Sequence, residues 1–223
     1  MLERITFENR EEWLAGRLHG IGGSEAAAAC GMSPWMTPME LWRLKCGAGK
    51  PKDLSDNAAV QQGVRMEPAL RSFFQAMHPE YSVEYHQFDI LHQAERPWLF
   101  ATLDGELTKK EYHGKEDDGW SISRGILEIK TATPNGKAGW SKWADGAMPQ
   151  NYYIQILHQL LATGYDFAYL FAALYSMNGD ITLREYEIQR ADVQGDLAWL
   201  IDKEDEFYRH VQNGTLPALT ISL

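Results

Sequence analysis

The stretch Gly125-Ile126-Leu127-Glu128-Ile129-Lys130-Thr131-Ala132 is short, mostly apolar and β-branched, which predicts a buried strand. Two charged residues interrupt it, and residues i and i+2 of a strand point to the same face. A carboxylate and an ammonium therefore stand side by side where an unpaired charge is costly. The carboxylate could bind a divalent cation, and the ammonium could meet a phosphate or an attacking water. A solvated ion pair is the alternative, because a Glu-x-Lys triplet arises by chance about once in such a chain.

Composition restricts the class of protein. The chain has 223 residues, of which 44% are hydrophobic, and this suits one globular domain over residues 1–223. No apolar run reaches membrane-spanning length, and the first residues lack the pattern of a secretory signal. Cys30 and Cys46 are too few for a four-thiolate metal site and are predicted to be reduced. These features predict a cytoplasmic protein with no membrane partner.

The formal net charge of -10 argues against a general nucleic-acid coat protein, which should be basic. It is compatible with an enzyme that admits DNA at one local basic channel. Part of the acidity is also expected if carboxylates hold metal ions.

A glycine-rich stretch near the N-terminus, 20–31, follows a short predicted helix that ends near Arg17. Ser24 is predicted to cap the next helix, which Gly31 ends. The stretch does not fit a nucleotide-binding loop, because Glu25 stands where a dinucleotide fingerprint needs its third glycine and no Gly-Lys-Ser/Thr follows. Two interpretations remain, a plain turn with a cap and an anion site built from free N–H groups.

The middle of the chain alternates between helical and strand patterns. Helices are predicted over 37–47 and 57–77, and the second contains Glu67, one turn after Gly63, and Pro68, which marks a helix start or a kink. Strands are predicted over 81–91 and 99–107, the latter carrying Asp104-Gly105. The polar stretch 108–124 fits a protruding hairpin or a mobile loop.

A clear helix follows the Glu128 strand, opening at Pro149 and ending at Gly164. Its polar stripe, spaced by three, four and seven residues, consists of Tyr152, Gln155, His158 and Gln159. Gln155 is the residue of this stripe that we expect to face the charged strand, whereas His158 is predicted to be a hydrogen-bonded structural histidine. Strands over 167–175 and 181–188 and a helix over 191–211 complete an α/β or α+β fold, with helices flanking one central mixed β-sheet.

Taken in order, Glu67, Asp104, Glu128, Lys130 and Gln155 make a set suited to metal-assisted phosphodiester hydrolysis. Carboxylate oxygens hold Mg²⁺, which keeps several waters and contacts substrate phosphate. Paired metal ions can activate water and stabilise the leaving oxygen. A lysine adds positive charge near the developing negative charge.

This order of residues resembles the PD-(D/E)xK nuclease superfamily, and more closely the phage-type alkaline exonucleases of the lambda exonuclease and YqaJ viral recombinase family. The resemblance covers roughly residues 17–175 and implies a restriction-endonuclease-like core. Each fragment is weak alone, and their joint order is specific. The fragments are Gly20-Ile21-Gly22-Gly23-Ser24-Glu25-Ala26, Ser33-Pro34-Trp35-Met36-Thr37-Pro38-Met39-Glu40-Leu41-Trp42, Gly63-Val64-Arg65-Met66-Glu67-Pro68, Leu103-Asp104-Gly105, Leu127-Glu128-Ile129-Lys130-Thr131 and Tyr152-Tyr153-Ile154-Gln155.

The resemblance implies a role for each matching residue. Asp104, Glu128 and the carbonyl of Ile129 would hold two Mg²⁺ ions, with Mn²⁺ as a substitute, and Glu67 would complete the ligand set of the second ion. Lys130 would orient or activate the attacking water, held by Gln155 and a tyrosine, Tyr152 or Tyr153. A further set would bind the 5′ phosphate of a DNA end and consists of Arg17, Ser24 and Thr102.

The implied activity is digestion of one strand of linear duplex DNA from 5′ to 3′, releasing 5′-phosphomononucleotides and leaving 3′ single strands for recombination by strand annealing. The implied partners are duplex DNA ends, two further copies in a homotrimeric ring, and a single-strand annealing protein. The resemblance also implies that the chain is encoded by a phage or prophage and acts in the bacterial cytoplasm. An endonuclease or resolvase of the same superfamily and an inactive DNA-end-binding protein are the alternatives. The superfamily often has its Asp and Glu closer in sequence, so Glu106 or an acid within 116–118 is the alternative to Asp104.

Overall fold

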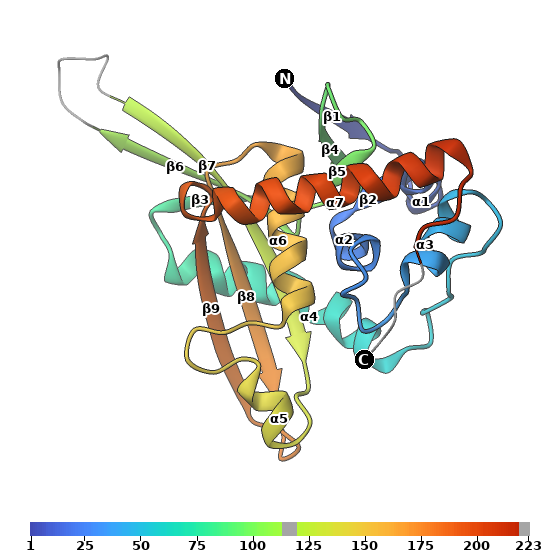
Figure 1. The fold of residues 1–223 in the computed structure, drawn as a ribbon. Coiled ribbons are helices and arrows are strands. Elements are labelled where there is room, and N and C mark those ends of the chain that lie inside the picture. Colours follow the sequence, from blue (N-terminus) through green and yellow to red (C-terminus); the bar gives the residue numbers. More distant parts are fainter. Residues whose placement is uncertain (113–119, 219–223) are drawn as a thin grey trace.

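A five-stranded mixed sheet carries the Glu128 stretch at its centre in the computed structural model, which describes residues 1–112 and 120–218. The strand β7 pairs in parallel with β8, and the other neighbouring strands are antiparallel (Figure 1). Residues 125–129 of β7 are buried, because this strand is central in the sheet and helices cover both of its faces. In spatial order the strands are β3 (Tyr81–Glu84), β6 (Gly105–Tyr112), β7 (Trp120–Ala132), β8 (Phe167–Tyr175) and β9 (Ile181–Gln189).

A second, four-stranded sheet lies beside the first and corrects the expectation of a single sheet. Its strands, in spatial order, are β1 (Leu2–Thr6), β4 (Asp89–Gln93), β5 (Leu99–Ala101) and β2 (Ile21–Gly22). The predicted strand 81–91 is two strands, one in each sheet, because the chain turns near Phe88, whose φ is +63°. The predicted strand 99–107 likewise divides into β5 and β6, and Asp104 lies in the bend between them.

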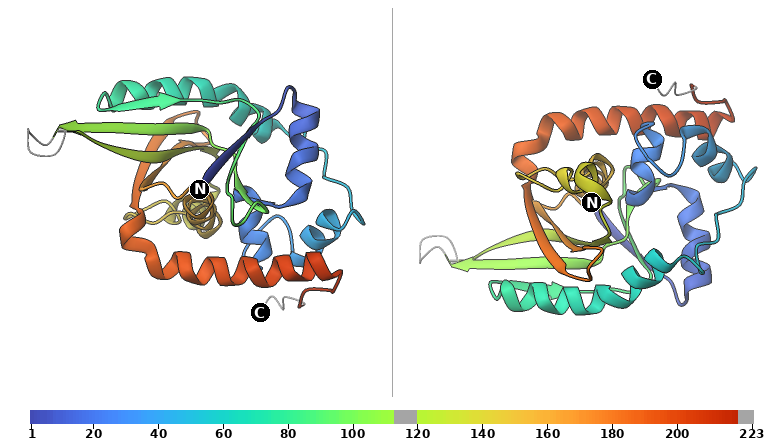
Figure 2. Two further views of the ribbon diagram at one scale, coloured as in Figure 1. Left: turned by 90° about the horizontal axis from the view of Figure 1, so that it is seen from above. Right: turned by 90° about the horizontal axis from the view of Figure 1, so that it is seen from below.

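Helices cover both faces of the five-stranded sheet. The helix α4 packs Leu70 and Phe74 against Leu127 and Phe171 on one face. On the other face α6 lies between the sheet and α7 (Figure 2). The helices are α1 (Arg10–Gly16), α2 (Gly23–Ala29), α3 (Pro38–Lys45), α4 (Ala58–Met77), α5 (Gly136–Ser141), α6 (Gln150–Thr163) and α7 (Gln194–Asn213), with short 3-10 turns η1 (Arg17–His19) and η2 (Arg190–Val193).

Pro68 lies inside α4, so a helix start at this residue is wrong. The strands β6 and β7 form a hairpin that protrudes from the body, and their ladder reaches Tyr112 and Trp120 (Figure 1). The tip, with the acids of 116–118, lies outside the described residues. Along the described chain, no helix is both long and apolar enough to cross a bilayer.

Candidate active site

Glu128 is the centre of the site, because it is only 2% exposed and its carboxylate accepts hydrogen bonds from several donors. It lies on the face of β7 that meets α6. Its Oε1 accepts hydrogen bonds from the Lys130 ammonium and from Gln155 Nε2, the latter at 2.6 Å. Its Oε2 accepts one from Gln159 Nε2, also at 2.6 Å. The structure thus confirms that Gln155 faces the charged strand and adds a second amide, Gln159, that our sequence analysis did not place in the site.

Lys130 remains a cation in this environment. Burial lowers its pKa, but Glu128 and Asp104 raise it more strongly, to about 12. Its ammonium lies 5.3 Å from the ring centroid of Tyr152. A lysine with this pKa is suited to orienting a water or phosphate oxygen and to opposing negative charge, and it is poorly suited to accepting a proton.

Asp104 reaches the same region from the bend between β5 and β6. Its Oδ2 accepts a hydrogen bond from the backbone N–H of Ile129 at 2.8 Å, and no donor in the described part of the chain contacts Oδ1. Burial, with the nearby charge of Glu128, raises the pKa of Asp104 well above its usual value. The alternative ligand Glu106 is engaged elsewhere, since Arg4 and the Tyr165 hydroxyl each contact it at 2.5 Å.

Glu67 approaches from α4 on the opposite side of β7. Its Oε1 accepts a hydrogen bond from Arg71 Nη2 at 2.5 Å, and Arg71 Nε donates to the carbonyl of Asp104, also at 2.5 Å. Burial raises the pKa of Glu67 in spite of Arg71, and Glu128 contributes to the increase. A Cβ atom at Gly63 would lie 3.3 Å from Thr131 Oγ1, so glycine lets α4 come close to the end of β7.

The donor chemistry of these three carboxylates fits Mg²⁺, which prefers hard oxygen ligands. Burial raises the pKa of both Asp104 and Glu67, the charge of Glu128 adds to the increase, and a divalent cation would stabilise the ionised carboxylates. As the side chains lie, no group of three or more His, Cys, Asp or Glu residues in the described ranges is arranged to hold a metal ion. The Lys130 ammonium and two amides contact Glu128 instead, so binding would require side-chain movement.

A second cluster, beside the first, contains the three residues predicted to bind the 5′ phosphate. Arg17 donates from Nη1 to Thr102 Oγ1 at 3.2 Å and from Nη2 to Ser24 Oγ at 3.3 Å. Its guanidinium lies 4.7 Å from the ring centroid of Trp13. Burial lowers the pKa of Arg17. Its guanidinium contacts hydroxyls and aromatic rings, with no carboxylate within ion-pair distance in the described structure. A cation with neutral partners is suited to an anionic ligand.

The start of α2 differs from the prediction. The helix begins at Gly23, its cap is Gly22, and Ser24 lies in the first turn. Glu25 replaces the predicted serine cap, since its Oε2 accepts the Gly22 N–H at 2.9 Å. The same oxygen accepts from buried Lys45 Nζ at 2.7 Å, and Lys45 also donates to the carbonyl of Arg17 at 2.9 Å. Ser24 is therefore free of the capping role and points to Arg17.

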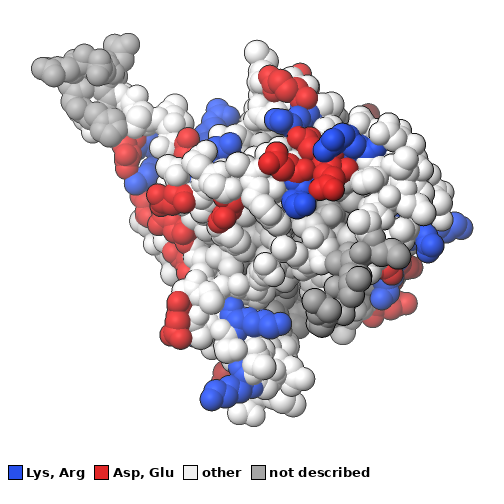
Figure 3. Space-filling view, viewed as in Figure 1, with Lys and Arg blue, Asp and Glu red and all other residues white. Residues whose placement is uncertain are grey.

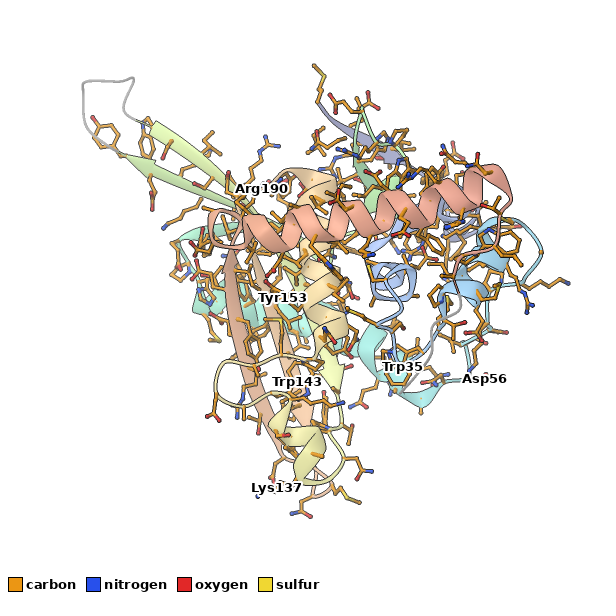
Figure 4. The ribbon with its side chains drawn as sticks, viewed as in Figure 1. Trp35, Asp56, Lys137, Trp143, Tyr153 and Arg190 are labelled. Atoms are coloured by element: carbon orange, nitrogen blue, oxygen red, sulfur yellow. The ribbon has the colours of Figure 1, made fainter. Side chains whose placement is uncertain are left out.

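The two tyrosines of α6 separate into different environments. Tyr153, labelled on α6 in Figure 4, donates its hydroxyl to Asp196 on α7 at 2.6 Å. Tyr152 instead lies beside Lys130. Buried Trp143 supports Tyr152, with ring centroids 5.6 Å apart. His158 is fully buried between Glu204 and the Phe100 carbonyl, at 2.7 and 2.8 Å, and is the predicted structural histidine.

Two residues of the site were missed at the sequence level. Arg71 is four residues after Glu67 and Gln159 four after Gln155, a spacing that places each pair on one helix face. The role of the Ile129 carbonyl stays a prediction, because the contact that the structure shows is that of its N–H.

Comparisons with known proteins show which proteins the chain resembles. The chain is 27% identical over 212 residues to the protein YqaJ of Bacillus subtilis (strain 168), covering 95% of this chain and 59% of that relative. The chain therefore spans less than two-thirds of the length of this relative.

Solved structures share the fold. The alkaline exonuclease LHK-Exo from Laribacter hongkongensis, in complex with dAMP, matches with a TM-score of 0.67 at 19% identity over 92% of this chain and 94% of that one. A phage-related exonuclease from Haemophilus somnus matches with a TM-score of 0.51 at 11% identity over 87% and 96%. The family model of the YqaJ-like viral recombinase domain matches residues 12–166, a range that holds both clusters from Arg17 to Gln159, and the chain belongs to this family.

Proposed function

We propose that this protein is a metal-dependent exonuclease that digests one strand of linear duplex DNA from its 5′ end. The observation that carries the proposal is the joint position of Glu128, Lys130, Asp104 and Gln155 beside the Arg17 cluster. Thr102 and Asp104 lie on one bend, so a terminal phosphate held at Arg17 would bring its own strand to the carboxylates. The exonucleases of similar fold support this assignment.

The metal ions in this proposal are Mg²⁺, two in number, with Mn²⁺ as a substitute. Asp104 and Glu128 would hold them with the Ile129 carbonyl, and Glu67 would be a further ligand. Such ions supply activation of water and neutralisation of phosphate charge.

The residues around the ions have separate roles in the proposal. Lys130, a cation with pKa raised to about 12, would orient the attacking water and oppose the charge on the scissile phosphate. Tyr152 would hold the Lys130 ammonium over its ring. Gln155 would keep Glu128 from following Lys130 when the ammonium turns to the substrate.

The direction of digestion, from 5′ to 3′, is also part of the proposal. Arg17, Ser24 and Thr102 would bind the terminal 5′ phosphate, and this anchoring would place the first phosphodiester bond of that strand at Lys130. Products would be 5′-phosphomononucleotides and a duplex with a 3′ single strand. Together with family membership, this outcome suits recombination by strand annealing with a dedicated annealing protein.

The test is release of nucleotides from linear duplex DNA with Mg²⁺, compared with covalently closed circular duplex and with chelator. Only the linear substrate should be digested, and Lys130→Ala and Glu128→Ala should abolish digestion while remaining folded. Lys109→Ala is the matched control, because Lys109 lies on the adjacent strand and pairs with Glu111 at 2.6 Å.

Cleavage of circular DNA would instead favour the endonuclease or resolvase. DNA binding without digestion by the wild type would favour the inactive end-binding protein. Near wild-type digestion by Lys130→Ala would contradict the proposed site.

A further inference from the structure

Gln159 is a buried polar residue whose position is explained by Glu128 and by little else. Its side chain is on α6 and the residue is 1% exposed. The Nε2 atom is 2.6 Å from Glu128 Oε2 and 3.5 Å from the Thr102 carbonyl. Both neighbours are acceptors, so this orientation of the amide is the one that lets Nε2 donate.

The other amide atom of Gln159 has no such explanation. Oε1 is buried without a hydrogen-bond partner in the described structure, a situation that typically destabilises a protein by about 1–3 kcal/mol. A methionine could fill this space without a polar atom in need of a partner. The feature of glutamine that the site uses is therefore its N–H, and this N–H is directed at Glu128.

Counting the acceptor positions of Glu128 shows what this N–H does. A carboxylate has about four lone-pair sites, two on each oxygen. Oε1 accepts from Lys130 and Gln155, and Oε2 accepts from Gln159 alone. One acceptor position remains, on Oε2, and its direction is set by the hydrogen bond that Gln159 makes to the same atom.

The side chains of Gln155 and Gln159 pack against the first turn of α2. A Cβ atom at Gly23 would lie 3.2 Å from Gln155 Cγ and 3.3 Å from Gln159 Cγ, so the first turn of α2 packs closely against both side chains. This packing limits the rotamers that Gln159 can adopt. It also joins the helix that carries Ser24 to the residues that hold Glu128.

We propose that Gln159 is a positioning residue that fixes Glu128 so that the remaining lone pair of Oε2 points to a divalent cation. The inference rests on the proposed function, in which Glu128 is a metal ligand. Residues that orient metal ligands through a hydrogen bond typically contribute about 10–100-fold to metal affinity or activity.

The test uses Gln159→Met, which keeps the length of the side chain and removes the donor, and Gln159→Glu, which replaces the donor by a negative charge. Thr163→Val is the control, since Thr163 is buried on the same helix and donates to the Gln159 carbonyl at 2.8 Å without touching Glu128. Mn²⁺ affinity is measured by electron paramagnetic resonance on the DNA-free protein, and kcat and KM on linear duplex DNA.

We expect Gln159→Met to weaken Mn²⁺ binding and to lower kcat by about 10–100-fold, with KM for DNA within about twofold of wild type. Gln159→Glu should be impaired more severely in kcat, because its carboxylate faces Glu128. Wild-type Mn²⁺ affinity and kcat in Gln159→Met would overturn the inference. Equal losses in Thr163→Val would also overturn it, because the cause would then be the helix. If wild type releases no nucleotides, the proposed function fails, and the Mn²⁺ comparison still decides the role of Gln159.

Discussion

Arg17 shows most directly how one residue in this fold is suited to a ligand. Its guanidinium packs against Trp13 and Phe100, and its hydrogen-bond partners are the hydroxyls of Thr102 and Ser24. A hydroxyl does not neutralise a guanidinium, whereas a phosphate carries the opposite charge and can accept two parallel hydrogen bonds from it. A terminal phosphate would provide the missing negative charge.

We therefore expect Arg17→Ala to remove most of the preference for 5′-phosphorylated over 5′-hydroxyl ends. Loss of a hydrogen bond to a charged group is typically about 1.5–3 kcal/mol, or roughly 10–150-fold in the rate ratio between the two ends. Digestion rates of both substrates are measured for the variant and for Arg209→Ala, a control whose Nε donates to a backbone carbonyl of α7. A full phosphate preference in Arg17→Ala would place the phosphate elsewhere.

At the scale of elements, α6 is joined to α7 through one fully buried pair, His158 and Glu204. Burial lowers the pKa of His158, but Glu204, the Phe100 carbonyl and Glu25 raise it more, so the net shift is upward. A pKa raised on folding stabilises the protein fully below the unfolded value, near 6.5, and this contribution is lost as pH rises through the folded value.

Thermal unfolding should therefore show stability that falls as the solution is made alkaline, and removal of His158 should reduce this dependence. His158→Leu leaves Glu204 buried without its partner and should destabilise the protein by about 3–5 kcal/mol. The double variant His158→Leu/Glu204→Leu should be more stable than His158→Leu, because no charge is left unpaired. Equal stability of the single and double variants would show that the pair is not coupled.

How much of this could be read from the sequence depends on how local each signal was. Glu128 and Lys130 follow from strand alternation, and the central sheet with its flanking helices follows from the order of patterns. The second sheet could not be predicted, because β1 pairs with β4 far along the chain and β2 contains two residues. The predicted serine cap of α2 was wrong, because Glu25 accepts the Gly22 N–H at the start of the helix and Ser24 contacts Arg17, which the fold brings beside it.

At the scale of the whole molecule, charge is distributed unevenly. On the face shown in Figure 3, Lys and Arg side chains occur at the bottom of the view, near α5. Lys137 lies in α5 and Lys142 directly follows this helix, beyond the Lys130 end of β7, and neither has a carboxylate within 4.0 Å in the described ranges. On a protein of net charge -10, these cations are candidates for contact with the DNA backbone.

Replacing both lysines with alanine should weaken binding to all DNA sequences and lower the slope of log affinity against log salt by about 1–2. Filter binding over a salt series measures this slope. The charge-matched control is Lys109→Ala/Lys203→Ala, whose lysines are paired with Glu111 and Glu206. A slope equal to that of wild type would show that the lysines at α5 do not contact the DNA backbone.

The same acidity motivates our proposal that the protein works as a homotrimeric ring. Affinity from a few phosphate contacts decreases steeply with salt, so continuous digestion would benefit from enclosure of the duplex. Sedimentation at micromolar concentration should give a trimer. A stable monomer under these conditions would contradict the ring.

The pairing of His158 with Glu204 also has a consequence for biosynthesis. Ribosomes add about 5–20 residues per second, so Glu204 is made roughly 2–9 s after His158, 46 residues earlier. During that interval the nascent α6 lacks the partner that its buried imidazole requires, and the amides that hold Glu128 belong to the same helix. We therefore expect the proposed nuclease activity to appear only after α7 has been synthesised and has docked against α6.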